Sequence, residues 1–192
     1  PTKTWWDWST AGQDLTAEPD EFGKATYLKK KGDFRWEKNV VPEYRWYNGQ
    51  ADYYLPGDKI NPENVLEINK LSGNIYDETA KITPFKMMRG KQIYDSGNNY
   101  LITPKMFGEG GYWTSFDWDK ASELGMAASN LPYSGKYDFV ETKMYWPVNH
   151  MVAPAELSLK CTACHTRKES KKLNWEALGY KGDPMSVGGR SK

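Results

Sequence analysis

The residues best suited to chemistry lie close together near the end of the chain. The sequence contains two cysteines, Cys161 and Cys164, and His165 directly follows the second. This C-x-x-C-H spacing is the attachment signature of c-type haem. Two thiols at i and i+3 on a helical turn can each form a thioether with a porphyrin vinyl group, and the next imidazole can bind the iron. We therefore expect Cys161, Cys164 and His165 to hold haem c, with His165 as a metal ligand.

Other roles of the cysteine pair stay open from the residues alone. A thioredoxin-like redox motif would lie near a βαβ pattern, which the sequence does not show. A zinc site needs four ligands and would have to use both cysteines and both histidines of the chain. A disulfide between Cys161 and Cys164 would close a very short loop and would stabilise the fold little.

A second ligand for the iron is expected from the segment before the motif. The other histidine is His150, and Met151 follows it. Neighbouring side chains point in different directions, so we expect only one of them to reach the metal. Histidine ligation gives a lower reduction potential than methionine ligation. We favour His150, bound to this haem or to a haem on a neighbouring chain, over the plainer role of a histidine bonded to a backbone carbonyl.

Composition excludes several classes of protein. The chain has 192 residues, a length typical of one domain, and its 26 basic and 25 acidic residues nearly cancel. This balance argues against a nucleic-acid partner. No apolar run approaches the roughly 20 residues needed for a membrane span. The chain begins at Pro1, and we expect that an upstream piece, with any export signal, was removed or belongs to a longer precursor.

Aromatic residues are unusually abundant, with nine Trp and thirteen Tyr. The plainer interpretation is that these rings fill the core of a protein with few aliphatic residues. The sharper interpretation is that they surround a large flat ligand and exclude water from it. A haem explains the excess better than a plain core, because the porphyrin itself would supply much of the apolar burial.

Little regular periodicity is visible, since eleven Pro and seventeen Gly divide the chain into short pieces. We expect a mostly irregular, loop-rich chain with a few short helices and a small antiparallel β-hairpin. The hairpin joins residues 92–94 to residues 100–102. Residues 1–32 are expected to form an extended N-terminal arm, and residues 33–192 a single haem c-binding domain.

Three short helices are expected from local signals. The first covers residues 117–128, with Asp117 as its N-terminal cap. The second begins near Pro154 and continues to Cys164, which places the two sulfurs on one face. The third covers residues 173–178 and ends at a glycine.

Several longer stretches carry a family resemblance, namely YWPVNHMVAP, LKCTACH, LGYKGDPMSVGGR, ITPFKMMRGKQIYD, FDWDKASELGM and NVVPEYRWYNG. They resemble the C-terminal part of the octahaem tetrathionate reductase family of multihaem cytochromes c, over most of the chain beyond about residue 33. The resemblance implies a fold of the multihaem cytochrome c type, with closely stacked, mostly bis-histidine haems outside the cytoplasm. It also implies that His150 is an axial ligand. Some members of that family reduce sulfur or nitrogen compounds.

The chain departs from that family in its number of haem motifs. A full member has eight, whereas this chain has one. The residues of a catalytic haem, including a lysine ligand, would lie upstream of the matching region, so the catalytic residues are unknown. We expect either the remainder of a longer multihaem cytochrome or separate haem-bearing chains as partners in an oligomer, together with redox partner proteins.

Three functions are compatible with these residues. The favoured one is electron transfer through one bis-histidine haem within a multihaem assembly, which makes the chain an electron-transfer module more than a complete enzyme. Covalent haem attachment takes place outside the cytoplasm, so we expect a periplasmic or extracellular location. The second is the C-terminal part of a multihaem reductase of sulfur or nitrogen oxyanions, with Arg45 and Arg89 in the site walls. Neutralisation of haem propionates or surface ion pairing is the plainer role of these arginines. The third is a structural clasp of a multihaem assembly or filament.

Overall fold

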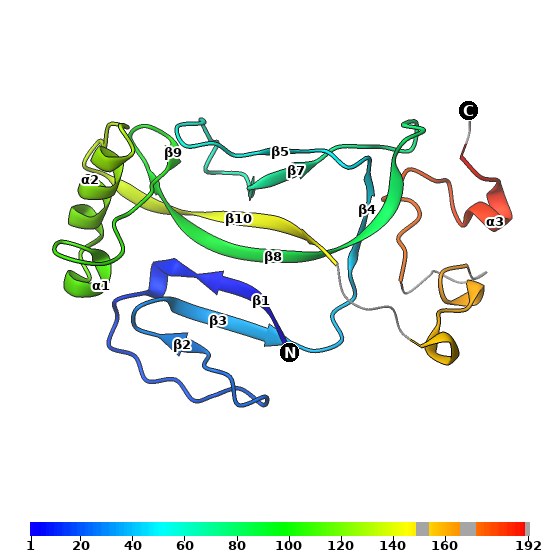
Figure 1. The fold of residues 1–192 in the computed structure, drawn as a ribbon, viewed down its shortest axis with the longest axis horizontal. Helices are drawn as coiled ribbons and strands as arrows, with labels where there is room; N and C mark the ends of the chain where they lie inside the picture. Colours follow the sequence, from blue (N-terminus) through cyan, green and yellow to red (C-terminus); the bar gives the residue numbers. More distant parts are fainter. Residues whose placement is uncertain (149–153, 166–171, 191–192) are drawn as a thin grey trace. The chain divides into compact units, whose positions relative to one another are not determined.

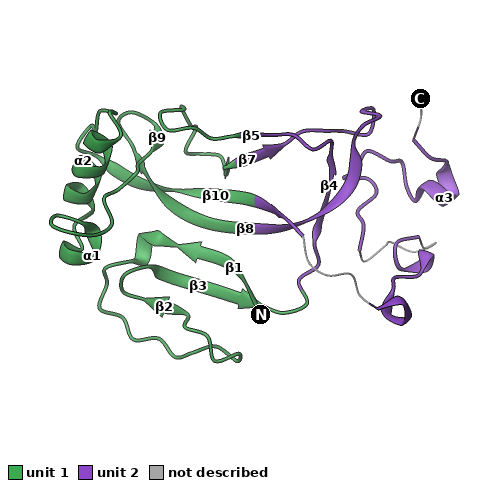
Figure 2. Ribbon diagram, viewed as in Figure 1, with its two compact units in different colours: residues 1–39, 53–68, 88–144 green, residues 40–52, 69–87, 145–192 purple. Residues whose placement is uncertain are grey.

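The computed structural model describes residues 1–148, 154–165 and 172–190. The chain forms two compact units, coloured separately in Figure 2. Unit 1 comprises residues 1–39, 53–68 and 88–144, and unit 2 comprises residues 40–52, 69–87 and 145–192. Each unit therefore combines three separate stretches of chain.

Strands make up most of the regular structure (Figure 1). They are β1 (Thr2–Asp7), β2 (Tyr27–Leu28), β3 (Gly32–Glu37), β4 (Glu43–Tyr47), β5 (Ala51–Tyr53), β6 (Leu66–Glu67), β7 (Asn69–Leu71), β8 (Lys81–Asp95), β9 (Tyr100–Leu101) and β10 (Tyr137–Pro147). The helices are α1 (Tyr112–Ser115), α2 (Trp118–Ala128) and α3 (Pro184–Val187), and the short 3-10 turns are η1 (Trp8–Thr10), η2 (Ala155–Leu157) and η3 (Cys161–Ala163). Within the described ranges, no helix is long and apolar enough to cross a membrane.

The main element is an eight-stranded mixed sheet, so the expectation of a mostly irregular chain with one small hairpin is wrong. The strand order is β2-β3-β1-β8-β10-β6, and β4 and β9 also pair with β8. β1 runs parallel to β8 and β6 parallel to β10, whereas the β1–β3, β4–β8 and β8–β9 pairs are antiparallel. The fold is mixed α/β with few helices. Its first strand comes from the segment that was expected to form an extended arm.

The longest strand, β8, was not predicted, because it contains residues that usually interrupt strands. It contains Pro84 and Gly90, and its side chains do not alternate between buried and exposed. Pro84 lies opposite Tyr44 of β4. A Cβ atom at Gly90 would lie 2.4 Å from the carbonyl oxygen of Trp6 on β1. The glycine therefore permits a close parallel approach of β1, and no local sequence pattern predicts such a long-range contact.

Two local expectations correspond to observed elements. The pairing of residues 94–95 with residues 100–101 lies where the hairpin was expected, but it forms one end of the 15-residue strand β8. The helix expected at residues 117–128 is confirmed as α2. The carboxylate of Asp117 caps this helix by accepting a hydrogen bond from the backbone N–H of Lys120 at 3.0 Å.

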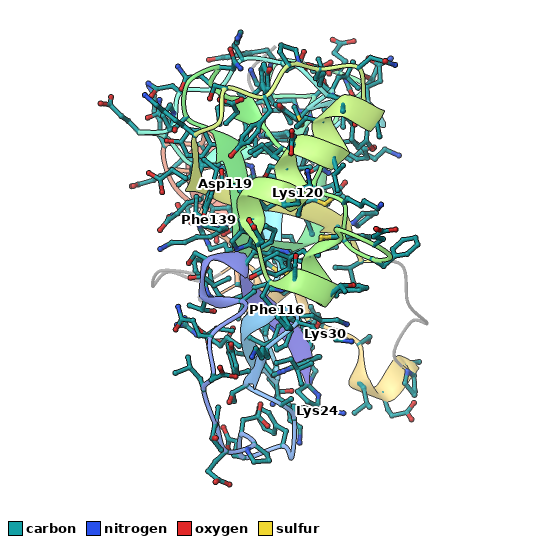
Figure 3. The ribbon with its side chains drawn as sticks, turned by 90° about the vertical axis from the view of Figure 1, so that its left-hand side faces the viewer. Lys24, Lys30, Phe116, Asp119, Lys120 and Phe139 are labelled. Carbon is teal, nitrogen blue, oxygen red and sulfur yellow. The ribbon has the colours of Figure 1, made fainter. Side chains whose placement is uncertain are left out.

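Aromatic rings fill much of the core of unit 1, as the plainer interpretation of their abundance predicts. Tyr112 stacks on Trp118 with 3.6 Å between ring centroids, and Phe139 meets Trp118 edge-on. Burial raises the pKa of Tyr112. Figure 3 shows Phe139 and Phe116 on the same side of unit 1 as α2. The buried members of this cluster are Ala11, Ile93, Tyr100, Ile102, Tyr112, Trp118, Ala121 and Met126.

A fully buried carboxylate organises the turn after β8. Asp95 accepts hydrogen bonds from the backbone N–H groups of Gly97, Asn98 and Ser134 and from the side chains of Asn98 and Ser134. Burial alone would raise the pKa of Asp95, but these hydrogen bonds outweigh it and hold the pKa below the usual value for aspartate. The charged carboxylate therefore stabilises the folded state.

We expect the substitution Asp95→Asn to destabilise the protein by about 1–3 kcal/mol, because its amide N–H group would face other hydrogen-bond donors. Urea unfolding at neutral pH measures this change. Asp52→Asn, at an exposed position on β5, is the matched control and should unfold at the wild-type urea concentration.

The stability difference should also depend on pH. The folded-state pKa of Asp95 is lowered, so its contribution is fully present above the unfolded-state pKa of about 4 and is lost as the pH falls through the folded-state value. The gap between wild type and Asp95→Asn should therefore shrink in acid. An equal gap at neutral and acidic pH would contradict this account.

Candidate haem c site

The C-x-x-C-H motif forms one tight turn in unit 2. The backbone N–H groups of Cys164 and His165 both donate to the carbonyl oxygen of Cys161, at 3.2 and 2.9 Å. The expected continuous helix from Pro154 is wrong, because η2 and η3 are separate 3-10 turns and the residues capping them at 158 and 160 are extended. In 3-10 geometry, side chains at i and i+3 lie on the same side. The short turn can therefore place Cys161 and Cys164 on one side, which the long helix was expected to do.

Both cysteines are free thiols. Neither sulfur takes part in a disulfide, and Cys161 is exposed while Cys164 is half-buried. Tyr44 on β4 lies close enough to Cys164 for a charge on that sulfur to affect the pKa of the tyrosine. Burial raises the pKa of Tyr44, and negative charge on Cys164 raises it further. The structure therefore offers two sulfurs for covalent attachment, with an aromatic strand nearby.

The contacts of His165 select one tautomer of its imidazole. Its Nδ1 atom lies 2.7 Å from Oδ1 of Asp183. An ionised carboxylate can only accept hydrogen bonds, so Nδ1 carries the proton and donates it. The lone pair of a neutral imidazole is then on Nε2, which is the atom left to bind a metal. Metal-binding histidines are usually oriented by such a partner on the other ring nitrogen.

Asp183 is itself fixed at the start of α3. Its Oδ1 atom also accepts a hydrogen bond from the backbone N–H of Met185 at 3.0 Å, and Pro184 occupies the first turn. The helix expected at residues 173–178 is wrong, because that stretch contains turns and the helix begins at Pro184. Sequence reasoning did not identify Asp183 as a site residue. An Asp-Pro pair is nevertheless a recognisable helix start.

Trp175 orients the histidine ring and fastens the turn. It stacks on His165 with 5.2 Å between ring centroids and 21° between planes. Its indole N–H donates to the carbonyl oxygen of Cys164 at 3.2 Å. The ring of Tyr180 meets Trp175 edge-on. The imidazole plane is therefore set by a stacked ring and by the carboxylate of Asp183.

The C-terminal segment that carries Asp183 is anchored to the rest of unit 2. Trp46 on β4 donates its indole N–H to the carbonyl oxygen of Leu178 at 2.8 Å. The guanidinium of Arg190 lies 4.2 Å from the Trp46 ring centroid. It also donates to the carbonyl oxygens of Asp77 and Ala80, at 2.9 and 2.7 Å. These contacts hold the segment in place on both sides of Asp183.

Large apolar side chains are exposed on both segments that form the site. Leu157 and Leu159, just before the motif, are 67% and 61% exposed, and Met185 on α3 is 72% exposed. Such a concentration of uncovered apolar surface indicates that a ligand or partner covers it. Two free thiols, an imidazole with a fixed proton and an apolar surround together fit a covalently attached haem. Among the described residues there is no cluster of three or more His, Cys, Asp or Glu side chains suited to a metal ion alone.

The other residues singled out in the sequence are His150, Met151, Arg45 and Arg89. His150 and its neighbour Met151 lie outside the described residues. Arg45 is exposed on β4, with its guanidinium 5.6 Å from the ring centroid of Tyr145. Arg89 is an exposed residue in the part of β8 that belongs to unit 1.

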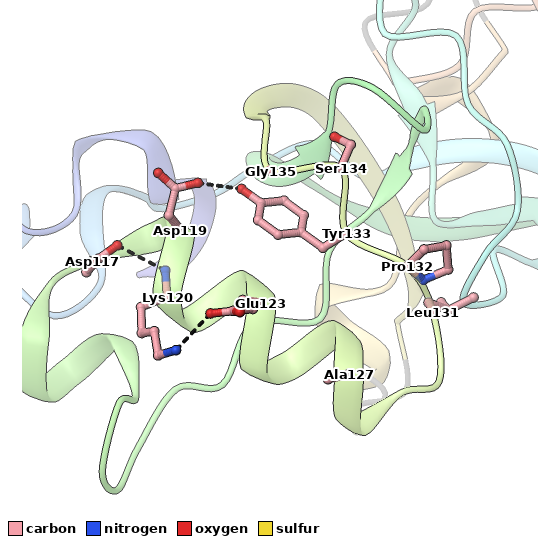
Figure 4. Close-up of a pocket in the computed structure, with 10 residues that line it drawn as sticks. All are labelled: Asp117, Asp119, Lys120, Glu123, Ala127, Leu131, Pro132, Tyr133, Ser134 and Gly135. Atoms are coloured by element: carbon pink, nitrogen blue, oxygen red, sulfur yellow. Dashed lines mark hydrogen bonds and ion pairs between the residues drawn. The ribbon is translucent and has the colours of Figure 1, made fainter.

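A hollow of about 720 Å³ lies in unit 1 beside α2 (Figure 4). Several of its polar side chains interact with one another, since Lys120 pairs with Glu123 at 2.8 Å and Tyr133 donates to Asp119 at 2.7 Å. Burial and this hydrogen bond raise the pKa of Tyr133. The polar groups in these contacts therefore stabilise α2 and the loop that follows it.

Comparison with known proteins agrees with the chemistry of the motif. A solved structure, the octahaem cytochrome c from Shewanella oneidensis, matches with 50% sequence identity and a TM-score of 0.92. The match covers 100% of this chain and 45% of that one, so the chain spans less than half the length of the octahaem protein. No curated protein matches significantly. The resemblance to multihaem cytochromes c is thus confirmed as similarity to part of an octahaem cytochrome.

The family model described as "Cytochrome c bacterial" matches residues 3–168 and thus includes the C-x-x-C-H motif. Proteins of this type carry haem c, so the match implies that cofactor. The chain belongs to the bacterial cytochrome c family.

Proposed function

We propose that this chain is an electron-transfer domain with one haem c, attached through Cys161 and Cys164 and ligated by His165. The hydrogen bond between His165 and Asp183 carries the proposal. It fixes the proton on Nδ1 and leaves Nε2 to bind iron, on the same turn as two free thiols.

The residues of the chain then have distinct tasks. Bound haem c supplies a one-electron couple between ferric and ferrous iron. Cys161 and Cys164 tether the ring, while Trp175 and Asp183 hold the imidazole plane and its proton. The exposed apolar side chains around the turn give the porphyrin a surface on which to pack and exclude water.

His150 is the proposed second axial ligand, to this haem or to one on a neighbouring chain. A second imidazole would saturate the iron, favour a low potential and prevent substrate binding. The 45% coverage of an octahaem protein supports a role within a larger multihaem assembly, made with the remainder of a longer cytochrome or with other haem-bearing chains. Since haem c is attached outside the cytoplasm, the assembly belongs in the periplasm or outside the cell.

Covalent attachment through both thiols can be tested by mass. We expect the double variant Cys161→Ser, Cys164→Ser to lack covalent haem, as measured by intact mass and by haem staining after denaturing electrophoresis. Thr162→Ala, at the exposed position between the cysteines, should retain it. A wild-type chain that carries no covalent haem when isolated from its natural host would overturn the proposal.

The second axial ligand can be identified from carbon monoxide binding to the native assembly after reduction. The wild type should show no change in its visible spectrum, because both axial positions are occupied. His150→Ala should open one position and bind carbon monoxide, whereas Met151→Ala should behave as wild type. If Met151→Ala opens the iron and His150→Ala does not, methionine is the ligand. Carbon monoxide binding by this haem in the wild type would contradict the six-coordinate assignment.

A further inference from the structure

The partner of the proposed iron ligand is a charged side chain with little access to water. Oδ1 of Asp183 lies 2.7 Å from Nδ1 of His165, and the side chain of Asp183 is only 10% exposed. Water screens a charge at such a position less than it screens a surface charge. The negative charge of Asp183 therefore acts on whatever His165 binds.

From this geometry we propose that Asp183 is a positioning residue that lowers the reduction potential of the haem ligated by His165. The inference rests on the proposed function. Ferric haem carries one more positive charge than ferrous haem, so a nearby carboxylate stabilises the ferric form more. By accepting a hydrogen bond from the Nδ1–H group, the carboxylate also makes the imidazole a stronger donor to the metal. Both effects favour the oxidised state.

Several contacts hold the carboxylate beside the imidazole. Its oxygen is committed to the N-terminal cap of α3 as well as to His165. On the imidazole, the stack with Trp175 restricts rotation away from the carboxylate. Arg190 and Trp46 anchor the segment that bears Asp183. Rotation of the charge into water would break the helix cap along with the imidazole contact, so the effect on potential is built into the fold.

The substitution Asp183→Asn removes the charge and keeps an oxygen that can accept both hydrogen bonds. In the full haem-loaded protein, we expect the ratio of ferric to ferrous haem at a given applied potential to fall about tenfold. For a one-electron couple, this is a rise of 59 mV in the reduction potential. Spectroelectrochemical titration measures the rise, and any other haems cancel in the comparison of variant with wild type.

Asp117→Asn is the matched control, because Asp117 caps α2 through the same kind of bond, accepted from the backbone N–H of Lys120. It removes one negative charge and should leave the potential unchanged. If Asp183→Asn does not load haem, Asp183→Glu and Asp183→Gln allow the same comparison of charged and neutral groups, and the Gln variant should have the higher potential.

The outcomes separate the inference from the proposed function. Covalent haem with equal potentials in wild type and Asp183→Asn would overturn the role of Asp183 alone. A shift of the same size in Asp117→Asn would also overturn it, because the effect would then reflect net charge. A wild-type chain without covalent haem would overturn the proposed function itself.

Discussion

The contact between His165 and Asp183 is the interaction on which the proposed chemistry of this chain depends. A free imidazole can carry its proton on either nitrogen, and the lone pair that can bind a metal is then on the other nitrogen. Here a carboxylate makes the choice, and Trp175 fixes the ring plane. In the proposed haem site the thiols would add attachment, but a tether alone would not decide which ring nitrogen faces the iron.

Much of unit 2 can be understood as support for that contact. The carboxylate has to be brought back to a turn that precedes it by 18 residues in the chain. A proline-started helix places it, and Trp46 and Arg190 anchor the returning segment to β4 and to the loop before β8. The sheet thus contributes through rigidity, since a site held by packed elements keeps its geometry better than one on a free loop.

The parts of this protein that were predictable from sequence are the local ones. The spacing of Cys161, Cys164 and His165 predicts a haem c site from five positions, and this stays a prediction, whereas the cap at Asp117 correctly predicts the start of α2. Asp183 was missed because its partner is remote in sequence, although the proline after it marks a helix start. The sheet was missed for a related reason. Gly90 looks like a strand breaker until the backbone of β1 lies against it.

The interleaved composition of the two units limits how the chain can be divided. Both are assembled from three stretches that alternate along the sequence. A cut anywhere between residues 40 and 144 therefore separates parts of both units, and each fragment lacks strands or loops that its neighbours require. Deletion mapping, which assigns activities to continuous pieces, would report that every region is essential, and domain shuffling would have to move the whole chain at once.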